Sequence, residues 1–265
     1  MGVPVAVTIA GSDSGGGAGI QADLKTFAAF GVYGATVITA LTAQNTKGVF
    51  AVHEVPADFI AAQIDAVFSD LDVAAVKIGM LGNAAAIEAV AAGLVRHGAR
   101  NVVLDPVMAA TSGERLLRAD ALDALLKLIP RASVVTPNLP EAAALLGLAA
   151  ARDDSEMLGQ GQKLLELGAA AVLIKGGHGS GPDSVDLLVE TAGSTRFSAP
   201  RLRTENSHGT GCTLASAIAA GLAKGLLLGE AVSEAKTYVT RAIAAADRLD
   251  IGSGRGPLHH FFKWW

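Results

Sequence analysis

The sequence has only one cysteine, and it carries no excess of positive charge. Cys212 is the only cysteine among 265 residues, so the chain cannot form an internal disulfide, which is typical of a reducing compartment. Its 21 lysines and arginines are outnumbered by 25 aspartates and glutamates, which gives a formal net charge of -4. That balance disfavours nucleic acid and acidic membrane surfaces as partners. We therefore expect a cytoplasmic protein whose partners are small molecules.

The sequence also lacks a hydrophobic run long enough to cross a membrane. The mean hydropathy is high at +0.41, and residues 26–46 and 206–223 contain no Asp, Glu, Lys or Arg. The first stretch is interrupted by glycines and polar residues, and the second is mainly apolar only over residues 214–223. A bilayer requires about 20 apolar residues, and the N-terminus has no basic segment typical of a signal peptide. We therefore expect a soluble protein.

Short strand-like runs alternate with alanine-rich helical stretches along the chain. We expect strands over residues 3–10, 35–42, 49–55, 74–78, 101–105, 132–136 and 170–175, and a hairpin over 184–190 and 195–198. We expect helices over residues 20–30, 57–69, 84–97 (capped by Asn83), 119–128, 140–146, 155–167, 213–224 and 230–249. Nearly continuous apolar strands between helices indicate a mainly parallel sheet covered on both faces. Because no linker or charge block divides the chain, we expect a single α/β domain over residues 1–265.

Polar and glycine residues cluster where the predicted parallel strands end. In open α/β sheets, ligands bind beyond these carboxyl ends, so we expect the functional site there. The residues concerned are Gly11, Gln44, Gly79, Asp105, Asn138 and Lys175.

The first glycine-rich segment, residues 11–19, joins a predicted strand to a predicted helix. It is not a Walker A loop, because no Gly-Lys-Ser/Thr sequence closes it. Residues 17–22 match a loose dinucleotide-binding pattern, but the next strand ends at Gln44 and Asn45 without the acidic residue that binds a ribose. An NAD-binding dehydrogenase is therefore an alternative that rests on a weak motif.

The second glycine-rich segment, residues 208–213, runs directly into an apolar helix. Amides at a helix start favour negative charge, so Gly209, Thr210, Gly211 and Cys212 could form an anion hole for a transferring phosphoryl group. The thiol of Cys212 would lie at the helix start, where its pKa tends to fall. A buried packing cysteine is the alternative, but the flanking glycines favour a functional role.

Three more strand ends carry residues suited to phosphate and metal chemistry. Asn138 and Glu141 are three residues apart and can share one helical face, and hard oxygen ligands near phosphate suit Mg²⁺. Asp105 could orient Mg²⁺ or the reacting hydroxyl, and Lys175 could bind ATP phosphates. Ordinary helix-start and turn chemistry is the alternative reading for each of them.

Taken together, these segments resemble the bacterial hydroxymethylpyrimidine/phosphomethylpyrimidine kinases, which are ribokinase-like enzymes of thiamine synthesis. The matching residues are 8–13 (TIAGSD), 16–26 (GGAGIQADLKT), 43–46 (AQNT), 77–81 (KIGML), 105–108 (DPVM), 136–142 (TPNLPEA), 175–178 (KGGH) and 208–213 (HGTGCT). The resemblance implies a ribokinase-like three-layer α/β/α sandwich, a homodimer, and Mg·ATP-dependent phosphorylation of 4-amino-5-hydroxymethyl-2-methylpyrimidine and then of its monophosphate. The family usually has a proline after the aspartate of the first loop, where this chain has Ser14 and Gly15.

The resemblance also assigns roles to individual residues. It implies that Cys212 stands where most ribokinase-like enzymes have an aspartate base, and that Gly209, Thr210 and Gly211 complete the anion hole. Asp105 and Glu141 would organise Mg²⁺, while Asn138, Lys175 and Thr210 would lie near the ATP phosphates. The pyrimidine pocket would be lined by Gly11, Asp23, Gln44, Met80 and Val107.

The chemistry of a 4-aminopyrimidine agrees with this assignment. Its edge offers an amino donor beside a ring-nitrogen acceptor, so the carboxamide of Gln44 can satisfy both and the carboxylate of Asp23 can accept another N–H. A pyridoxal kinase of the same fold is the nearest alternative. A sugar or nucleoside kinase fits less well, because the sequence lacks the lid-like insertion expected for sugar substrates. A dehydrogenase and a non-catalytic pyrimidine-binding protein are the alternatives from other classes.

Overall fold

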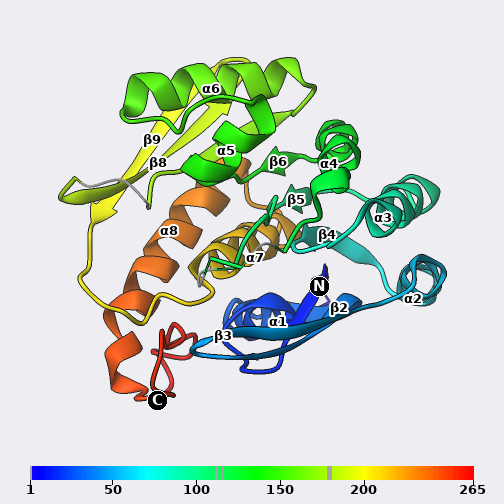
Figure 1. Ribbon diagram of the computed structural model, residues 1–265, viewed down its shortest axis with the longest axis horizontal. Helices are drawn as coiled ribbons and strands as arrows, with labels where there is room; N and C mark the ends of the chain where they lie inside the picture. Colours follow the sequence, from blue (N-terminus) through cyan, green and yellow to red (C-terminus); the bar gives the residue numbers. More distant parts are fainter. Residues whose placement is uncertain (1, 111–112, 115, 178–180) are drawn as a thin grey trace.

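The fold is described by a computed structural model that covers residues 2–110, 113–114, 116–177 and 181–265. Within these residues the strands form one nine-stranded sheet in the order β3-β2-β1-β4-β5-β6-β7-β8-β9 (Figure 1). The strands are β1 (Val5–Asp13), β2 (Tyr33–Asn45), β3 (Gly48–Glu54), β4 (Val73–Ile78), β5 (Val102–Leu104), β6 (Val134–Val135), β7 (Ala171–Lys175), β8 (Asp183–Glu190) and β9 (Gly193–Pro200). The 175–178 motif is described as far as Gly177, and His178 lies outside the described residues.

The centre of the sheet is parallel and its two edges are antiparallel. Strands β2, β1, β4, β5, β6 and β7 pair in parallel with their neighbours. Strand β3 returns antiparallel beside β2, and the β8–β9 hairpin closes the opposite edge. The prediction of a mainly parallel sheet is thus confirmed, and the carboxyl ends of the parallel strands meet along one edge of the sheet.

Helices cover both faces of the sheet. They are α1 (Gly19–Ala29), α2 (Ala57–Phe68), α3 (Ala84–Arg96), α4 (Leu122–Leu128), α5 (Leu139–Leu146), α6 (Asp154–Glu166), α7 (Thr210–Ala223) and α8 (Leu228–Ala244), with short 3-10 turns η1 (Ala119–Ala121), η2 (Ile129–Arg131) and η3 (Ala246–Arg248). Alternate strand residues face opposite layers: Val76 and Ile78 belong to the core beneath α2–α6, whereas Ala75 belongs to the core beneath α1, α7 and α8. The three-layer sandwich is therefore confirmed.

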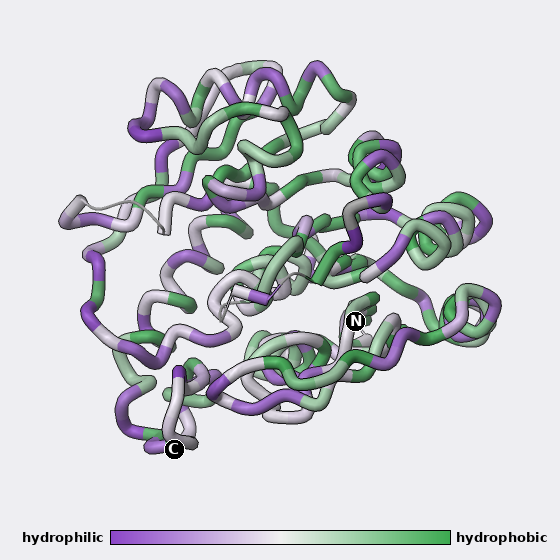
Figure 2. The backbone as a smooth tube through the Cα atoms, in the orientation of Figure 1, coloured by the Kyte–Doolittle hydropathy of each residue, from purple (hydrophilic) through white to green (hydrophobic). Residues whose placement is uncertain are grey.

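The hydropathy of each layer follows from its exposure. Figure 2 shows that the outer helices α3 and α6 carry both hydrophobic and hydrophilic segments, as expected when one face packs on the sheet and the other meets solvent. Helix α7 is buried from Thr213 to Gly221, because α1, α8 and the sheet surround it. None of the helices in the described residues is long and apolar enough to span a bilayer.

Local sequence signals determine where three of the helices begin. The side chain of Asn83 accepts a hydrogen bond from the Ala86 N–H, as predicted for the cap of α3. Asn138 and Glu141 form a reciprocal capping box at the start of α5. Helix α7 begins at Thr210, three residues earlier than we predicted, because Gly209 adopts a left-handed conformation with φ of 82° and turns the chain into the helix.

Candidate active site

A cavity of about 800 Å³ opens at the carboxyl ends of the parallel strands and extends to the start of α7. All of the predicted site residues line it except Asp23: they are Gly11, Gln44, Met80, Asp105, Val107, Asn138, Glu141, Lys175, Gly209, Thr210, Gly211 and Cys212. A smaller hollow of about 460 Å³ lies between α6 and the β8–β9 turn, where Leu158, Gln162 and Glu190 line it, and it contains none of the predicted residues. The larger cavity is the candidate active site.

The N-terminus of α7 forms one wall of this cavity. A Cβ on Gly209 would collide with the carbonyl oxygen of Gly17, so the two glycine-rich segments touch backbone to backbone. The hydroxyl and the N–H of Thr210 both donate to the Ser207 carbonyl, at 2.7 and 3.3 Å. The amides of Gly211 and Cys212 are therefore the first-turn donors best placed for an anion.

Two buried carboxylates and one ammonium lie next to that helix start. Lys175 Nζ is 2.6 Å from Asp105 Oδ1 and 3.8 Å from Glu141 Oε2, and a Cβ on Gly211 would lie 3.4 Å from the same ammonium. Burial lowers the pKa of Lys175, but the charges of Asp105 and Glu141 outweigh it and hold the pKa above its usual value. Burial raises the pKa of Glu141 to about 7; Lys175 opposes this rise and Asp105 adds to it.

The same cluster can be tested as a Mg²⁺ site. Among the described residues, no group of three or more His, Cys, Asp or Glu side chains could hold a metal ion, so the chain offers Asp105 and Glu141 as a pair. Mg²⁺ typically binds through one or two carboxylates and takes its remaining ligands from water and substrate phosphates. The two carboxylates share the single ammonium of Lys175, so they have the chemistry to accept a second cation. The donor set therefore fits Mg²⁺.

Cys212 faces the cavity from the first turn of α7. Burial raises the pKa of this thiol to about 11, and the charge of Lys77 only partly offsets that rise. The expectation that the helix start would lower this pKa is therefore wrong: protein atoms replace the water that would solvate a thiolate, and this effect is the larger one.

Asp23, predicted to line the pyrimidine pocket, lies behind the cavity wall. Its carboxylate is completely buried and accepts hydrogen bonds from Thr8 Oγ1 and Ser216 Oγ, both at 2.6 Å. It also forms an ion pair with Lys77 Nζ at 2.9 Å. These partners occupy the carboxylate. Lys77, which sequence reasoning did not select, borders the cavity instead, although its side chain is also completely buried. Burial lowers the pKa of Lys77, but the charges of Asp23, Cys212 and Asp105 raise it above its usual value.

The first glycine-rich segment folds around the side chain of Asp13. The carboxylate accepts the N–H groups of Gly15, Gly17 and Ala18 at 2.8, 3.0 and 2.8 Å. His208 Nε2, from the second glycine-rich segment, lies 2.9 Å from the same carboxylate. Asp13 and His208 therefore join the two segments, which the sequence analysis did not anticipate for either side chain.

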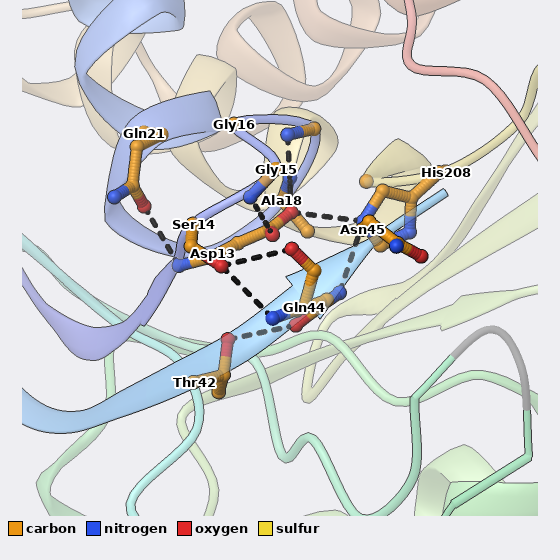
Figure 3. A network of polar contacts seen from close by, with 12 residues as sticks. Asp13, Ser14, Gly15, Gly16, Ala18, Gln21, Thr42, Gln44, Asn45 and His208 are labelled. Carbon is orange, nitrogen blue, oxygen red and sulfur yellow. Dashed lines mark hydrogen bonds and ion pairs between the residues drawn. The ribbon is translucent and has the colours of Figure 1, made fainter. Parts of the chain in front are cut away.

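Gln44 lies at the end of β2 and is held at both its backbone and its side chain (Figure 3). Ser14 Oγ donates to the Gln44 carbonyl and accepts from the Gln44 N–H, both at 2.8 Å. The carboxamide lies 3.1 Å from Thr42 Oγ1 and 3.2 Å from His208 Nε2. Ser14 thus fixes the junction between the loop and β2.

The remaining pocket residues are apolar or lie toward the other end of the cavity. A Cβ on Gly11 would lie 3.0 Å from Met80 Sδ, so these residues pack together on a wall that also includes Val107. At the far end, Lys236 Nζ forms an ion pair with Asp186 Oδ2 at 2.8 Å. No local sequence pattern indicates that pair, because its members come from the hairpin and the last long helix and meet only in the fold.

Comparisons with known proteins agree with this geometry. The family model described as phosphomethylpyrimidine kinase matches residues 13–259. The hydroxymethylpyrimidine/phosphomethylpyrimidine kinase of Rhizobium meliloti is 62% identical over 262 residues, which cover 98% of each chain. A solved structure of phosphomethylpyrimidine kinase from Clostridium difficile has a TM-score of 0.81 and 46% identity, covering 91% of this chain and 99% of that one.

A second solved structure has the same fold but belongs to an enzyme named for another activity. The ADP complex of Bacillus subtilis pyridoxal kinase has a TM-score of 0.89 and 36% identity, and the similarity covers 98% of each chain. The overall fold therefore does not separate the two activities, whereas sequence identity favours the pyrimidine kinases. From the extent of the family match and the identity to its members, the chain belongs to the phosphomethylpyrimidine kinase family.

Proposed function

We propose that the chain uses ATP to phosphorylate 4-amino-5-hydroxymethyl-2-methylpyrimidine and then phosphorylates the monophosphate to the diphosphate, in thiamine biosynthesis. One observation carries the proposal: the α7 N-terminus, Lys175 and Asp105 lie in the same cavity as the Gln44 carboxamide. An anion-binding helix start beside buried charges suits phosphoryl transfer, and an amide paired with an apolar wall suits a heteroaromatic ring. The identity of 62% to a named pyrimidine kinase supports the substrate class.

In the first phosphorylation the hydroxymethyl oxygen attacks the γ-phosphorus of ATP. A new P–O bond forms, the bond to the β,γ-bridging oxygen breaks, and ADP leaves. The hydroxyl proton passes to the thiolate of Cys212, because Cys212 faces the cavity and is the candidate base. Since its pKa is about 11, only a small fraction of the thiol is ionised at neutral pH, and Lys77 favours that fraction. The Gly211 and Cys212 amides and Lys175 stabilise the charge on the transferring group.

The second phosphorylation needs less help from a base. Its acceptor is a phosphate that is already anionic at neutral pH, so the main barrier is the approach of two negatively charged groups. The cations and amides around Lys175, Gly211 and Cys212 reduce that repulsion. Cys212→Ala should therefore impair the first step more than the second, by about 10²- to 10⁴-fold in kcat for the first step.

Mg²⁺ belongs to the same proposal. Asp105 and Glu141 would hold it, and it would neutralise phosphate charge when bound. Lys175, which bridges these carboxylates, is close enough to the α7 N-terminus to contact a phosphate oxygen instead. Asn138 uses its side-chain oxygen to cap α5, so its NH₂ group stays available for phosphate.

The test supplies each acceptor separately with ATP and Mg²⁺ and follows the products by ³¹P NMR. We expect monophosphate from the alcohol and diphosphate from the monophosphate, with Cys212→Ala slow mainly in the first reaction. Absence of ADP release with either pyrimidine would refute the proposal and favour a binding protein. Equal losses in both steps would show that Cys212 serves the anion hole rather than proton transfer.

Pyridoxal phosphorylation is the second candidate, favoured by the TM-score of 0.89 to Bacillus subtilis pyridoxal kinase. Pyridoxal also carries a hydroxymethyl group on a heteroaromatic ring, so it needs the same transfer chemistry. Including it in the assay separates the candidates: a wild-type enzyme that prefers pyridoxal and stops at a monophosphate would replace the pyrimidine proposal.

We further propose that residues 1–265 act as one cytoplasmic kinase domain that forms a homodimer. One sheet runs through the described part of the chain, and the single cysteine suits a reducing compartment. Edge strand β3 supports dimerisation, because its Phe50 and Val52 are 70% and 44% exposed. Light scattering should give a dimer mass that Phe50→Glu reduces to a monomer mass; a wild-type monomer would refute this.

A further inference from the structure

The Gln44 carboxamide lies between two side chains that constrain its orientation (Figure 3). One end of the amide is 3.2 Å from His208 Nε2, and the other end is 3.1 Å from Thr42 Oγ1. The hydroxyl of Thr42 also lies 2.9 Å from the Ser12 carbonyl, which can only accept a hydrogen bond. The positions of the hydrogens follow from these partners.

His208 carries its proton on Nε2. That nitrogen is 2.9 Å from Asp13 Oδ2, and the carboxylate of Asp13 also receives three backbone N–H donors. Burial raises the pKa of Asp13, but the hydrogen bonds from His208, Ala18 and Gly15 bring it below its ordinary value. An ionised carboxylate has no proton to give, so the hydrogen between the two groups belongs to His208.

This proton determines how the amide of Gln44 must lie. With the amide nitrogen toward His208, as drawn in Figure 3, two N–H donors would face each other. Exchanging the nearly isosteric amide oxygen and nitrogen removes the conflict. The oxygen then shares the single Nε2–H of His208 with Asp13 Oδ2 in a three-centre hydrogen bond. The NH₂ donates to Thr42, whose own proton goes to Ser12. Every hydrogen in this network then has an acceptor.

The fixed amide keeps one free lone pair on its oxygen and one free N–H. Together they match a ring that offers an amino donor beside a ring-nitrogen acceptor, as a 4-aminopyrimidine does. A 4-oxopyrimidine offers the reverse pair, a carbonyl acceptor beside a ring N–H. A freely turning glutamine would suit both rings equally, so discrimination requires that the amide be held.

We propose that His208, held by Asp13, is a positioning residue that fixes the Gln44 carboxamide and so makes the pocket select 4-amino over 4-oxo pyrimidines. The proposal rests on the pyrimidine kinase function proposed above. The Ser14 hydroxyl supports the proposal because it fixes the Gln44 backbone. Rotation of the terminal amide group is then the main motion left to the polar end of the side chain. Specificity then arises because a 4-oxopyrimidine would place its polar groups against like groups of the Gln44 amide and leave them without hydrogen-bond partners.

The experiment measures kcat/KM for the 4-amino and 4-oxo forms of 5-hydroxymethyl-2-methylpyrimidine. We expect the wild type to prefer the amino form by at least about 10²-fold, because both polar contacts are mismatched with the oxo form. His208→Leu removes the N–H that holds the amide, so the preference should fall by about tenfold or more while the KM for ATP changes little. His208→Gln can still donate to both Asp13 and Gln44, so it should retain most of the preference.

Thr42→Val tests the other end of the amide independently, with Thr42→Ser as its matched control. Thr42→Val should lose selectivity and Thr42→Ser should keep it, so this pair decides the question if His208→Leu does not fold. A wild-type ratio in folded His208→Leu and in Thr42→Val would overturn the inference while leaving the pyrimidine kinase function intact. A wild type that phosphorylates neither ring would overturn both.

Discussion

The ion pair between Lys77 and Asp23 should control the reactivity of the only cysteine. Both side chains are completely buried and their charged atoms are 2.9 Å apart. The two charges act on Cys212 in opposite directions: Lys77 lowers the pKa of the thiol, and Asp23 raises it. Lys77→Met and Asp23→Asn disrupt the same pair, yet they should move the thiol in opposite directions.

The size of the effect follows from the pKa of the thiol. At a pKa of about 11, roughly one thiol in a thousand is ionised at about pH 8. Loss of a nearby charge shifts a pKa by roughly 1–3 units, and each unit changes the thiolate fraction about tenfold. Alkylation of Cys212 at that pH should therefore slow at least about tenfold in Lys77→Met and accelerate at least about tenfold in Asp23→Asn.

The assay is the rate of iodoacetamide addition, followed by mass spectrometry across pH. It reports on one site, because Cys212 is the only cysteine in the chain. Each single variant leaves a buried charge unpaired and should lose about 3–5 kcal/mol of stability, so the free energy of unfolding is measured in parallel. The double variant removes both charges, so its stability and thiol reactivity should lie near those of the wild type.

Two results would refute the reasoning. Faster alkylation in both single variants would mean that loosened packing, not charge, exposes the thiol. Unchanged alkylation in folded Lys77→Met would mean that Lys77 does not favour the thiolate, and the role of Lys77 in proton transfer would be lost with it.

Three further predictions concern a backbone turn, a buried carboxylate and a helix cap. Gly209→Ala should lower kcat by about 10²- to 10³-fold, because the new Cβ would collide with the Gly17 carbonyl and push the α7 N-terminus out of place. Gly225 also has a positive φ of 86° but has open space around it, so Gly225→Ala is the control that should cost only backbone strain. Steady-state kinetics compares the two variants. The folded-state pKa of Glu141, about 7, lies above its usual 4.5, so its contribution to stability is complete below pH 4.5 and is lost as the pH rises through 7. Glu141→Gln cannot ionise, so its free energy of unfolding in urea should not show this decrease of about 3 kcal/mol between pH 4.5 and 7. Wild-type and Glu141→Gln proteins with the same pH dependence of stability would contradict the prediction. Asn83→Ala should lower the free energy of unfolding by about 1 kcal/mol, because α3 loses its cap, and an unchanged urea midpoint would contradict this.

Much of the fold was predictable from the sequence, because its causes are local. Apolar runs of strand length between amphipathic helices indicate a covered parallel sheet, and Asn83 caps α3 through a contact only three residues away. The position of the site was predictable for a related reason. The carboxyl ends of parallel strands must meet at one edge, so residues that follow different strands, such as Asp105 and Lys175, come together whatever their separation in the chain.

The tertiary structure alone decided how the individual side chains are used. Asp23 accepts from Ser216, which is 193 residues away, and pairs with Lys77, so it lies behind the cavity rather than on its wall. The contact between Gln44 and His208 spans 164 residues, and no local pattern indicates it. The direction of the Cys212 pKa shift depends on burial, which the sequence does not report, and burial outweighs the effect of the helix start. Hydrogen bonding and desolvation depend on which atoms surround a group in space, and only the folded chain determines those neighbours.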